Sequence, residues 1–389
     1  MSDTTSSTRK GPLSGLKVVE LAGIGPGPMA AMLLADLGAT VIRVDRKQPV
    51  ALGISRPLRF NTLLRNRETI ALDLKDPKAV SLVLDLVAEA DALVEGFRPG
   101  VTERLGLGPD ACLARNPRLA YGRITGWGQT GPLANWAGHD VNYLALTGVL
   151  DAIGRAGQPP TIPLNLVGDY AGGSLYLVVG LLAAILEARR SGQGQVVDAA
   201  IVDGAAHLAS TFAGMVAGGI WKPERGTNIS DSGSHFYDCY ECSDERWIAV
   251  GPIEEKFFDQ LVARLGLDPA ALGPQMSREH WPEAKRILAA HFKTKTRDEW
   301  SALLEASDCC VSPVLTFAEA PDHPHLRARG TFIEIDGIAQ PAPAPRFSRT
   351  PPSTPTAPEA VTAESTAHAL AGWLGAERIP ALRAEGLID

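Results

Sequence analysis

The first part of the chain alternates short apolar runs with longer segments in which apolar residues recur at helical spacing. The apolar runs predict strands and the longer segments predict helices: strands at Leu16–Leu21, Thr40–Asp45, Thr69–Leu74 and Ala92–Glu95, and helices at Met29–Leu37 and Lys78–Ala90. Strands that alternate with helices form parallel sheets covered by helices. The pattern therefore predicts an α/β fold with a large, Rossmann-like domain, in which ligands collect at the carboxyl ends of the strands.

The middle of the chain continues this domain and then changes in texture. Helical segments at Asp140–Gly148 and Tyr170–Arg190 precede a strand at Gln195–Val202. Beyond about Gly214 a hairpin and three helices predict a smaller α+β domain: strands at Phe236–Glu241 and Trp247–Val250, and helices at Lys256–Leu265, Trp281–Phe292 and Arg297–Ala306.

The last part of the chain is dense in proline. Pro341–Pro358 predicts an extended strap rather than a helix or strand, and a helix follows at Ser365–Leu374. We therefore divide the chain into the N-terminal part of a large domain at 1–213, a small domain at 214–330, and a C-terminal strap at 331–389 that returns to the large domain.

Composition excludes several classes of protein. A formal charge of −7 argues against nucleic-acid binding, which needs a basic excess. The longest apolar stretch, Leu175–Leu186, is well short of the ~20 residues of a membrane span, and the polar start Met1–Lys10 lacks the apolar core of a signal peptide. We expect a cytoplasmic protein without a membrane span.

The five cysteines are too few for a disulfide framework in a chain of 389 residues. Cys239 and Cys242 form a C-x-x-C motif, the spacing of many zinc and redox sites. On the predicted strand, however, positions i and i+3 face opposite sides, so the two thiols diverge. We expect no metal site here.

A glycine-rich loop, Gly23–Pro28, lies between a predicted strand and a predicted helix, and Asp45 follows at the distance seen in nicotinamide dinucleotide fingerprints. The third glycine position is Pro28, and Pro26 also lacks the backbone N–H that would hold a pyrophosphate. The loop thus favours a tight strand-to-helix turn over an oxidoreductase, and we expect no cofactor.

Cations are scattered on and between the predicted strands: Arg46, Arg65, Arg67, Lys75, Arg98 and Arg104. Each alone is typical of a solvated surface charge. Arg46, Lys75 and Arg98, however, lie at or just past strand ends, where a parallel sheet forms its ligand crevice. Together they suit a phosphorylated ligand, because the planar guanidinium group of arginine binds phosphate bidentately.

Three further residues are candidates for proton transfer. His139 follows a loop rich in glycine, proline and tryptophan and directly precedes a predicted helix, a position that often carries site residues. Asp169 stands immediately ahead of the predicted buried helix, where an N-cap aspartate and an acid/base group are both compatible with the local sequence. Glu254, after the small-domain hairpin, is compatible with a solvated surface charge.

Taken together, these segments resemble the α-methylacyl-CoA racemases, within the family III CoA-transferase superfamily. The resemblance runs nearly end to end: Leu13–Leu21, Gly25–Pro28, Phe97–Val101, Gly126–Gly131, Ala137–Tyr143, Pro163–Asp169, Gly192–Asp198, Val311–Leu315 and, more loosely, Pro345–Ser348. It implies a substrate that is a 2-methyl-branched acyl-CoA. It also implies an interlocked homodimer in which each active site lies between the large domain of one subunit and the small domain of the other.

The resemblance assigns roles to residues. It implies that His139, hydrogen-bonded to Glu254 of the partner subunit, and Asp169 are the acid/base groups that flank the α-carbon. It implies that Arg46, Lys75, Arg98 and Arg104 help to hold CoA in the large domain. Other residues would line the CoA site: Ile24, Leu72, Asp73, Gly96, Phe97, Gly138, Asp140 and Tyr143.

The implied chemistry suits these residue types. Inversion next to a thioester needs one group to remove a proton from one face and another to return it on the opposite face, through an enolate. An imidazole and a carboxylate do this without a metal or pyridoxal. Backbone N–H groups at the start of the helix after Asp169 would stabilise the oxyanion. A helix N-terminus lowers the pKa of a carboxylate and burial raises it, so burial must prevail if Asp169 is a base.

Two other functions compete with this interpretation. Relatives in the superfamily use an aspartate at the position of Asp169 as a nucleophile that forms a mixed anhydride, which would make the chain a CoA-transferase. The family pattern Leu-Asp-Gly-Gly-Ala-Pro is replaced here by Ser230–His235, and Glu255 stands where the family usually has proline. A homologue that binds acyl-CoA without turnover is the third interpretation, and it rests only on the changes at Ser230–His235.

Overall fold

The computed structural model describes residues 9–48 and 53–388, so most of the polar start Met1–Lys10 lies outside the described residues. The chain divides into two compact units. Unit 1 comprises Met1–Leu146, Leu164–Leu208 and His325–Asp389, and unit 2 comprises Thr147–Pro163 and Ala209–Pro324. Residues 147–163, which the sequence-based division placed within 1–213, have their contacts in unit 2.

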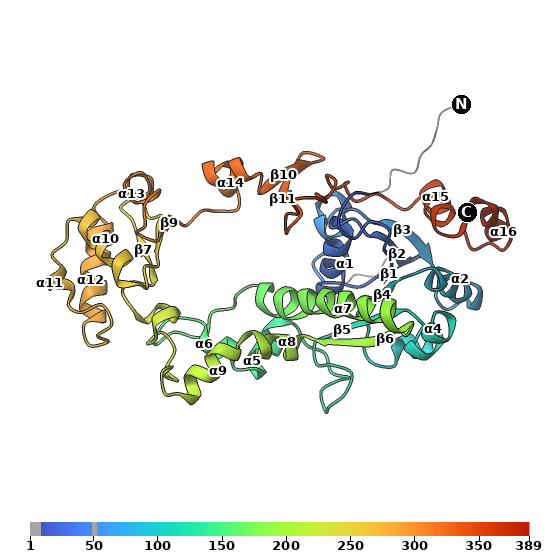
Figure 1. Ribbon diagram of the computed structural model, residues 1–389, viewed down its shortest axis with the longest axis horizontal. Coiled ribbons are helices and arrows are strands. Elements are labelled where there is room, and N and C mark those ends of the chain that lie inside the picture. The colour runs from blue at the N-terminus through green and yellow to red at the C-terminus, as the bar shows by residue number, and fades with distance from the viewer. Residues whose placement is uncertain (1–8, 49–52, 389) are drawn as a thin grey trace. The chain divides into compact units, whose positions relative to one another are not determined.

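Unit 1 is built on a six-stranded sheet with the order β3-β2-β1-β4-β5-β6, in which all neighbouring strands are parallel (Figure 1). The strands are β1 (Lys17–Leu21), β2 (Thr40–Arg46), β3 (Glu68–Leu72), β4 (Ala92–Glu95), β5 (Ala120–Thr125) and β6 (Gln195–Ala200). This confirms the predicted α/β fold with a parallel sheet. The order reverses direction between β1 and β4, the point at which doubly wound sheets form their ligand crevice.

Strand β5 is the one strand of this sheet that the apolar pattern did not predict. Its sequence holds Gly122 and Arg123, neither of which is typical of a buried strand. A Cβ at Gly122 would stand 2.8 Å and 2.9 Å from side-chain atoms of Leu177 and Leu181, so glycine lets the neighbouring helix approach the strand closely. Arg123 is buried in ion pairs with Glu95 and Glu103.

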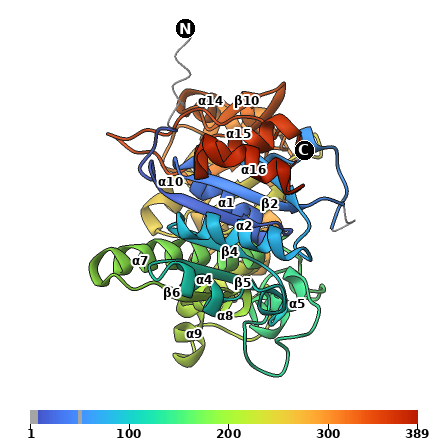
Figure 2. The same ribbon diagram turned by 90° about the vertical axis from the view of Figure 1, so that its right-hand side faces the viewer.

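The two faces of the sheet are covered by different helices. Val18 and Val41 pack on one face with α1 (Pro26–Asp36) and α7 (Tyr176–Ser191). The alternate residues Val19 and Ile42 pack on the other face, as the twofold repeat of a strand requires. That face is covered by α2 (Pro77–Ala88), α4 (Pro109–Arg115), α15 (Ala363–Leu374) and α16 (Ile379–Ala384), and Figure 2 looks onto it.

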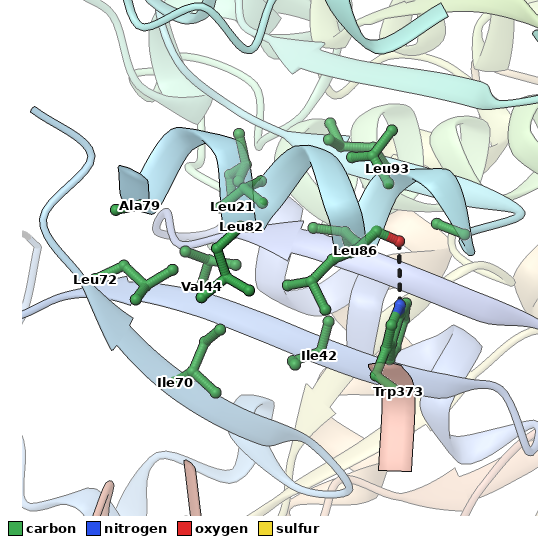
Figure 3. Close-up of a cluster of buried hydrophobic side chains, with 14 of the residues drawn as sticks. Leu21, Ile42, Val44, Ile70, Leu72, Ala79, Leu82, Leu86, Leu93 and Trp373 are labelled. Carbon is green, nitrogen blue, oxygen red and sulfur yellow. Dashed lines mark hydrogen bonds between the residues drawn. The ribbon is translucent and has the colours of Figure 1, made fainter. Parts of the chain in front are cut away.

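The C-terminal segment completes this second face. Leu82 and Leu86 of α2 pack on the strand residues, and the indole N–H of Trp373 donates a 3.0 Å hydrogen bond to the carbonyl oxygen of Leu86 (Figure 3). Each fully buried leucine of this kind contributes about 1.5–3 kcal/mol to folding. Leu86 and Trp373, which are 287 positions apart in sequence, therefore share one core.

The remaining elements of unit 1 are short. They are α3 (Val101–Arg104), α5 (Asp140–Leu146), α8 (Ile201–Leu208) and the hairpin of β10 (Phe332–Ile335) and β11 (Ile338–Pro341). Helix α14 (Pro324–Arg329) stands where the chain passes from unit 2 to unit 1. Helix α1 begins at Pro26, three residues before the predicted start at Met29, because proline in the first turn needs no N–H partner and fits the helix.

One helical segment requires a correction to the membrane argument. Ten residues with π-helical hydrogen bonding, Leu166–Leu175, run directly into α7. The combined helix Leu166–Ser191 has 26 residues and is long and apolar enough, by length and composition, to cross a membrane. Half of its most apolar stretch is buried within the protein, and α7 packs against β5 and β6, which is the behaviour of a core helix.

Unit 2 holds a three-stranded antiparallel sheet, β7-β8-β9, and most of the other helices. The strands are β7 (Asp238–Glu241), β8 (Trp247–Val250) and β9 (Val311–Pro313), and the helices are α6 (Val149–Ala152), α9 (Ser210–Ala217), α10 (Glu255–Leu265), α11 (Pro269–Leu272), α12 (Trp281–Phe292) and α13 (Arg297–Leu304). Phe236, Phe292 and Trp300 are fully buried in its own core. The predicted hairpin and the three predicted helices are all present.

Candidate functional site

The carboxyl ends of the parallel strands lead into loops that meet at one edge of the sheet. β1 runs into Ile24, β2 ends at Arg46, and β4 runs into the segment Gly96–Arg98. Because parallel strands end on the same side, these loops converge although they are far apart in sequence.

A cleft of about 470 Å³ opens at this edge. Nine of the predicted site residues line it: Ile24, Arg46, Gly96, Phe97, Arg98, Gly138, His139, Tyr143 and Asp169. The structure thus brings His139 and Asp169 into the same cleft as two of the predicted cations. All of these residues belong to unit 1.

Asp169 lies inside the π-helical segment and is not its N-cap. The N-cap position is held by Asn165, whose side chain makes no capping bond, and Asp169 lies in the first turn. Burial raises the pKa of the Asp169 carboxyl to about 6, the negative charge of Asp140 adds to the rise, and Asn165 and His139 oppose it. The nearest Asn165 contact, Nδ2 to Oδ2 of Asp169, is long at 3.5 Å. Burial therefore prevails over the effects that favour the carboxylate, so Asp169 titrates close to the range of an imidazole.

Asp140, predicted to line the site, is instead buried behind it with 5% of its surface exposed. Its Oδ2 accepts the backbone N–H of Asp169 at 2.7 Å, and the N–H of Gly168 also bonds to this carboxylate. A Cβ at Gly168 would stand 2.4 Å from Oδ2 of Asp140, so only glycine fits there. Asp140 therefore fixes the backbone on which Asp169 is carried.

Two backbone N–H groups at this point of the helix are already engaged within the protein. The N–H of Asp169 is bound to Asp140, and the N–H of Tyr170 donates to the carbonyl oxygen of Asn165. A donor to a developing oxyanion must be free to point at the ligand. The N–H of Tyr170, the first residue after Asp169, is therefore not free for a ligand, and oxyanion donors farther along this helix stay a prediction.

His139 is exposed and is held by the backbone around it. Its N–H donates to Oδ1 of Asn142 at 3.0 Å, and the N–H of Asn142 donates back to the carbonyl oxygen of His139 at 2.8 Å. The hydroxyl of Tyr143 donates to the carbonyl oxygen of Gly138, and its ring meets Trp127 edge-on at 4.7 Å. A Cβ at Gly138 would clash with both rings, which explains the glycine directly before His139.

The six cations separate into three groups. Arg46 and Arg98 line the cleft, and the guanidinium of Arg46 stands 5.8 Å from the ring centre of Phe97. Lys75 and Arg104 are exposed and outside the cleft lining. The remaining two of the six are buried in ion pairs and therefore structural: Arg65 with Asp36 and Arg67 with Glu20.

Two further residues predicted to line the CoA site are not in the cleft lining. The side chain of Leu72 is 1% exposed and belongs to the hydrophobic core, so this residue reaches a ligand only through its backbone. Asp73 is exposed, and its Oδ1 accepts the N–H of Lys75 at 3.1 Å. Its present role is to order the turn after β3.

Comparison with known proteins places this geometry in a family. The sequence profile of CoA-transferase family III matches residues 13–362. The chain belongs to this family. It is 47% identical over 341 residues to the α-methylacyl-CoA racemase of Mus musculus and 44% identical over 340 residues to that of Homo sapiens, with 87% of both chains covered in each case.

A solved structure of a family III relative shares the fold. The crystal structure of a CaiB/BaiF family protein from Brucella suis matches with a TM-score of 0.78 at 27% sequence identity, and covers 97% of this chain and 99% of that one. The resemblance seen in the sequence motifs is confirmed.

Glu254, the third residue predicted to take part in proton transfer, lies in unit 2. It precedes α10 directly, and its side chain is exposed. Its predicted partner His139 lies in unit 1.

The departure from the family III pattern at Ser230–His235 affects the interior of unit 2. Asp231 and Asn228 form a capping box, and Ser232 adopts a positive φ of 72°. His235 is fully buried, with its ring edge-on to Phe236 and Phe258. Neither ring nitrogen has a hydrogen-bond partner among the described residues, and burial, aided by Lys285, lowers the pKa of His235 to about 4.

Sequence reasoning missed two tryptophans of the cleft. Trp136 is 69% exposed, and Trp127 packs beneath Tyr143. The signal was present, because the loop before His139 stands out by its glycine, proline and tryptophan content. An indole that remains exposed in a cleft is typical of a ligand contact.

The C-x-x-C pair is arranged as its strand position predicts. Cys239 is exposed and Cys242 is buried. In the described part of the chain, no group of three or more His, Cys, Asp or Glu side chains is placed to hold a metal ion.

Proposed function

We propose that this chain inverts the α-carbon of 2-methyl-branched acyl-CoA thioesters. The observation that carries the proposal is that His139 and Asp169 line one cleft together with Arg46 and Arg98. The pKa of Asp169, about 6, lies near that of an imidazole. A carboxyl group with such a raised pKa can both accept and donate a proton near neutral pH, as a two-base inversion requires.

In the proposed reaction one group removes the α-proton and the other delivers a proton to the opposite face. The enolate between the two steps carries its charge on the thioester oxygen. The reaction needs no metal and no organic cofactor, because both proton carriers are side chains and the thioester itself acidifies the α-carbon. That the enzyme acts without a cofactor is part of the proposal.

CoA would be held by the cations of the carboxyl edge. Arg46 and Arg98 are in the cleft. Lys75 and Arg104 are exposed: Lys75 lies after strand β3, and Arg104 is the last residue of α3. Arginine pairs bidentately with phosphate, and lysine adds a point charge. The CoA nucleotide supplies several phosphates for such a cluster.

The active unit would be an interlocked homodimer in which Glu254 of the partner subunit meets His139. Two facts support it: Glu254 is exposed on a unit that does not contain His139, and α7 together with the residue before it exposes a row of apolar side chains at Leu175, Val179 and Leu186. Refolding inactive His139→Ala chains together with inactive Glu254→Ala chains should restore activity, because a hybrid dimer regains one intact site. Absence of recovery despite proven hybrids would contradict the shared site.

The deciding experiment is incubation of one enantiomer of a 2-methylacyl-CoA in D₂O with no second acid. We expect uptake of deuterium at the α-carbon together with loss of optical purity. A CoA-transferase would show neither. It would instead exchange CoA between two acids and form an acyl adduct on Asp169 that hydroxylamine cleaves.

The CoA-transferase remains the second candidate, because the family profile covers it and a carboxylate lies in the cleft. Its nucleophile has to be ionised and exposed to the thioester, and burial that raises the pKa of Asp169 favours a proton carrier over a nucleophile.

The cytoplasmic location of the protein stays a prediction.

A further inference from the structure

A buried ion-pair network lies directly behind the loop that carries Arg98. Glu95, the last residue of β4, is fully buried. One carboxylate oxygen accepts the backbone N–H of Phe97 at 2.7 Å, and the other accepts Nε of Arg123, also at 2.7 Å. This carboxylate therefore joins the start of the loop to the neighbouring strand β5.

The same arginine also holds the far end of the loop. Arg123, 6% exposed, donates from one terminal nitrogen to Oε1 of Glu103 at 2.7 Å. Its other terminal nitrogen lies 3.3 Å from the hydroxyl of Thr102 and 3.4 Å from Oε2 of Glu103. The Arg123 contact lowers the pKa of Glu103, so this second anchor is a carboxylate at neutral pH.

Between the two anchors lie residues of the proposed CoA site. Gly96, Phe97 and Arg98 line the cleft, and Arg104 directly follows Glu103. The turn is tightened by Gly100 at a φ of 80° and by the N–H of Val101, which donates to the carbonyl oxygen of Arg98.

The position of the Arg46 guanidinium also depends on this segment, because the guanidinium stands over the ring of Phe97. Glu95 fixes the backbone N–H of that phenylalanine. The network thus sets the places of three cations on different elements without lying in the cleft itself.

From this arrangement we infer that Glu95 and Arg123 are positioning residues for the CoA nucleotide, an inference that rests on the proposed function. They act by holding Arg46, Arg98 and Arg104 in place before the ligand arrives, so that binding need not order them. The proton carriers His139 and Asp169 are on other elements. The effect should therefore fall on CoA affinity and not on turnover.

The test compares Glu95→Gln with a variant of a similar buried ion pair elsewhere in unit 1. The amide of this variant would offer one carbonyl oxygen in place of two carboxylate oxygens, so either Phe97 or Arg123 loses its acceptor. Asp36 and Arg65 form an ion pair of similar burial, each 3% exposed, and their side-chain hydrogen bonds among the described residues go to none of the cleft-lining residues. Asp36→Asn controls for the loss of a buried charge.

We measure KM and kcat for inversion, CoA affinity by calorimetry, and the free energy of unfolding. Glu95→Gln should raise both KM and the Kd of CoA about 10–100-fold, the range of one lost charge-assisted contact, with kcat within about twofold. Asp36→Asn should lower stability and leave KM and Kd unchanged. Equal KM values for Glu95→Gln and wild type, or a fall in kcat alone, would overturn the inference.

A second variant covers the case in which Glu95→Gln does not fold. The side chain of Glu103 is 44% exposed, so we expect Glu103→Gln to fold and to weaken only the second anchor. It should raise the Kd of CoA by a smaller factor than Glu95→Gln, and an unchanged Kd would contradict the role of Arg123. A wild-type protein that binds no CoA would refute the proposed function itself, a result separate from either variant.

Discussion

The two edges of the sheet in unit 1 differ in one respect: the carboxyl edge carries arginines without an ion-pair partner among the described residues, Arg46 and Arg98, beside the paired Arg123. At the amino edge, Arg65 bonds to Asp36 and to Gln340, and Asp36 also accepts from Asn66. At the carboxyl edge, Arg46 and Arg98 form no ion pair with any residue that the structure describes. Paired cations hold the fold together, and unpaired ones are available to a ligand.

The sizes of the two cavities do not follow the distinction between paired and unpaired cations. The larger cavity, about 820 Å³, lies at the amino edge between the start of β3, the proline-rich strap and α15. Its walls include Thr69, Thr356 and His368. Two charged side chains of its lining, Asp36 and Arg67, are bonded to the buried partners Arg65 and Glu20. The smaller cleft holds the proton carriers and the unpaired cations, so chemistry and not volume marks the site.

The largest expected effect is at the carboxyl edge. Asp169→Asn fills similar space but cannot accept a proton, which leaves His139 as the one base. Inversion should fall by roughly 10²–10⁴-fold. Single-turnover α-proton exchange should survive best for the enantiomer that faces His139. Inversion at the wild-type rate would show that Asp169 takes no part in proton transfer.

At the amino edge we expect a large loss of folding stability without a change in substrate binding. Arg65→Met leaves the carboxylate of Asp36 buried and without its main partner, which costs about 3–5 kcal/mol of unfolding free energy. Urea denaturation should show the loss, and KM should be unchanged for the protein that remains folded. The double variant with Asp36→Leu serves as the control and should recover part of the stability.

Next in size are the unpaired cations. Arg46→Ala or Arg98→Ala should raise KM about 10–100-fold with kcat little changed, because phosphate contacts bind ground and transition states alike. Lys75→Ala, outside the cleft lining, should raise KM less. Steady-state kinetics at low and high salt provides the measurement, and a loss confined to kcat would contradict the assignment.

The pH dependence should follow Asp169. Its pKa is raised from 3.8 to about 6, so the step in which it accepts a proton slows as the pH falls through 6. A raised carboxyl pKa stabilises the fold below the unfolded value, and this contribution is lost as the pH rises through 6. Asp169→Asn should therefore be more stable than wild type at pH 8, with the difference gone by about pH 4. Thermal denaturation of both proteins between pH 4 and pH 8 measures this difference in stability.

The smallest effect is expected at the amino-edge cavity. His368→Ala and Thr356→Ala change only exposed side chains there. Both kinetic constants should stay at wild-type values, and unfolding free energies should change by no more than about 0.5 kcal/mol. A clear rise in KM would show that the cavity also serves the substrate.

Sequence reasoning succeeded where the signal is local. Apolar runs marked five of the six parallel strands. Strand ends pointed to Arg46 and Arg98, which line the cleft, and also to Lys75, which does not. Strand ends set these apart from Arg65 and Arg67, but the sequence did not predict the ion pairs that bury those two, because their partners are 29 and 47 residues away. Pairing across such distances leaves no local pattern.

The same limit applies to the chemistry of the cleft. The family resemblance implied that Asp140 lines the site, yet its carboxylate turns inward to the backbone of Asp169. The choice between helix cap and acid/base group for Asp169 also depended on tertiary structure. The helix starts earlier, at Leu166, and the surrounding residues bury the carboxyl enough to raise its pKa.

The return of the C-terminal segment to unit 1 has a consequence for synthesis on the ribosome. All of unit 2 emerges before His325, so its core can form while unit 1 still lacks α15 and α16. Until Trp373 is released, the α2 face of the nascent sheet keeps Leu86 and its neighbours uncovered. A chain terminated before Ala363 should therefore be a target for chaperones and proteases even though every residue lining the cleft has already been made.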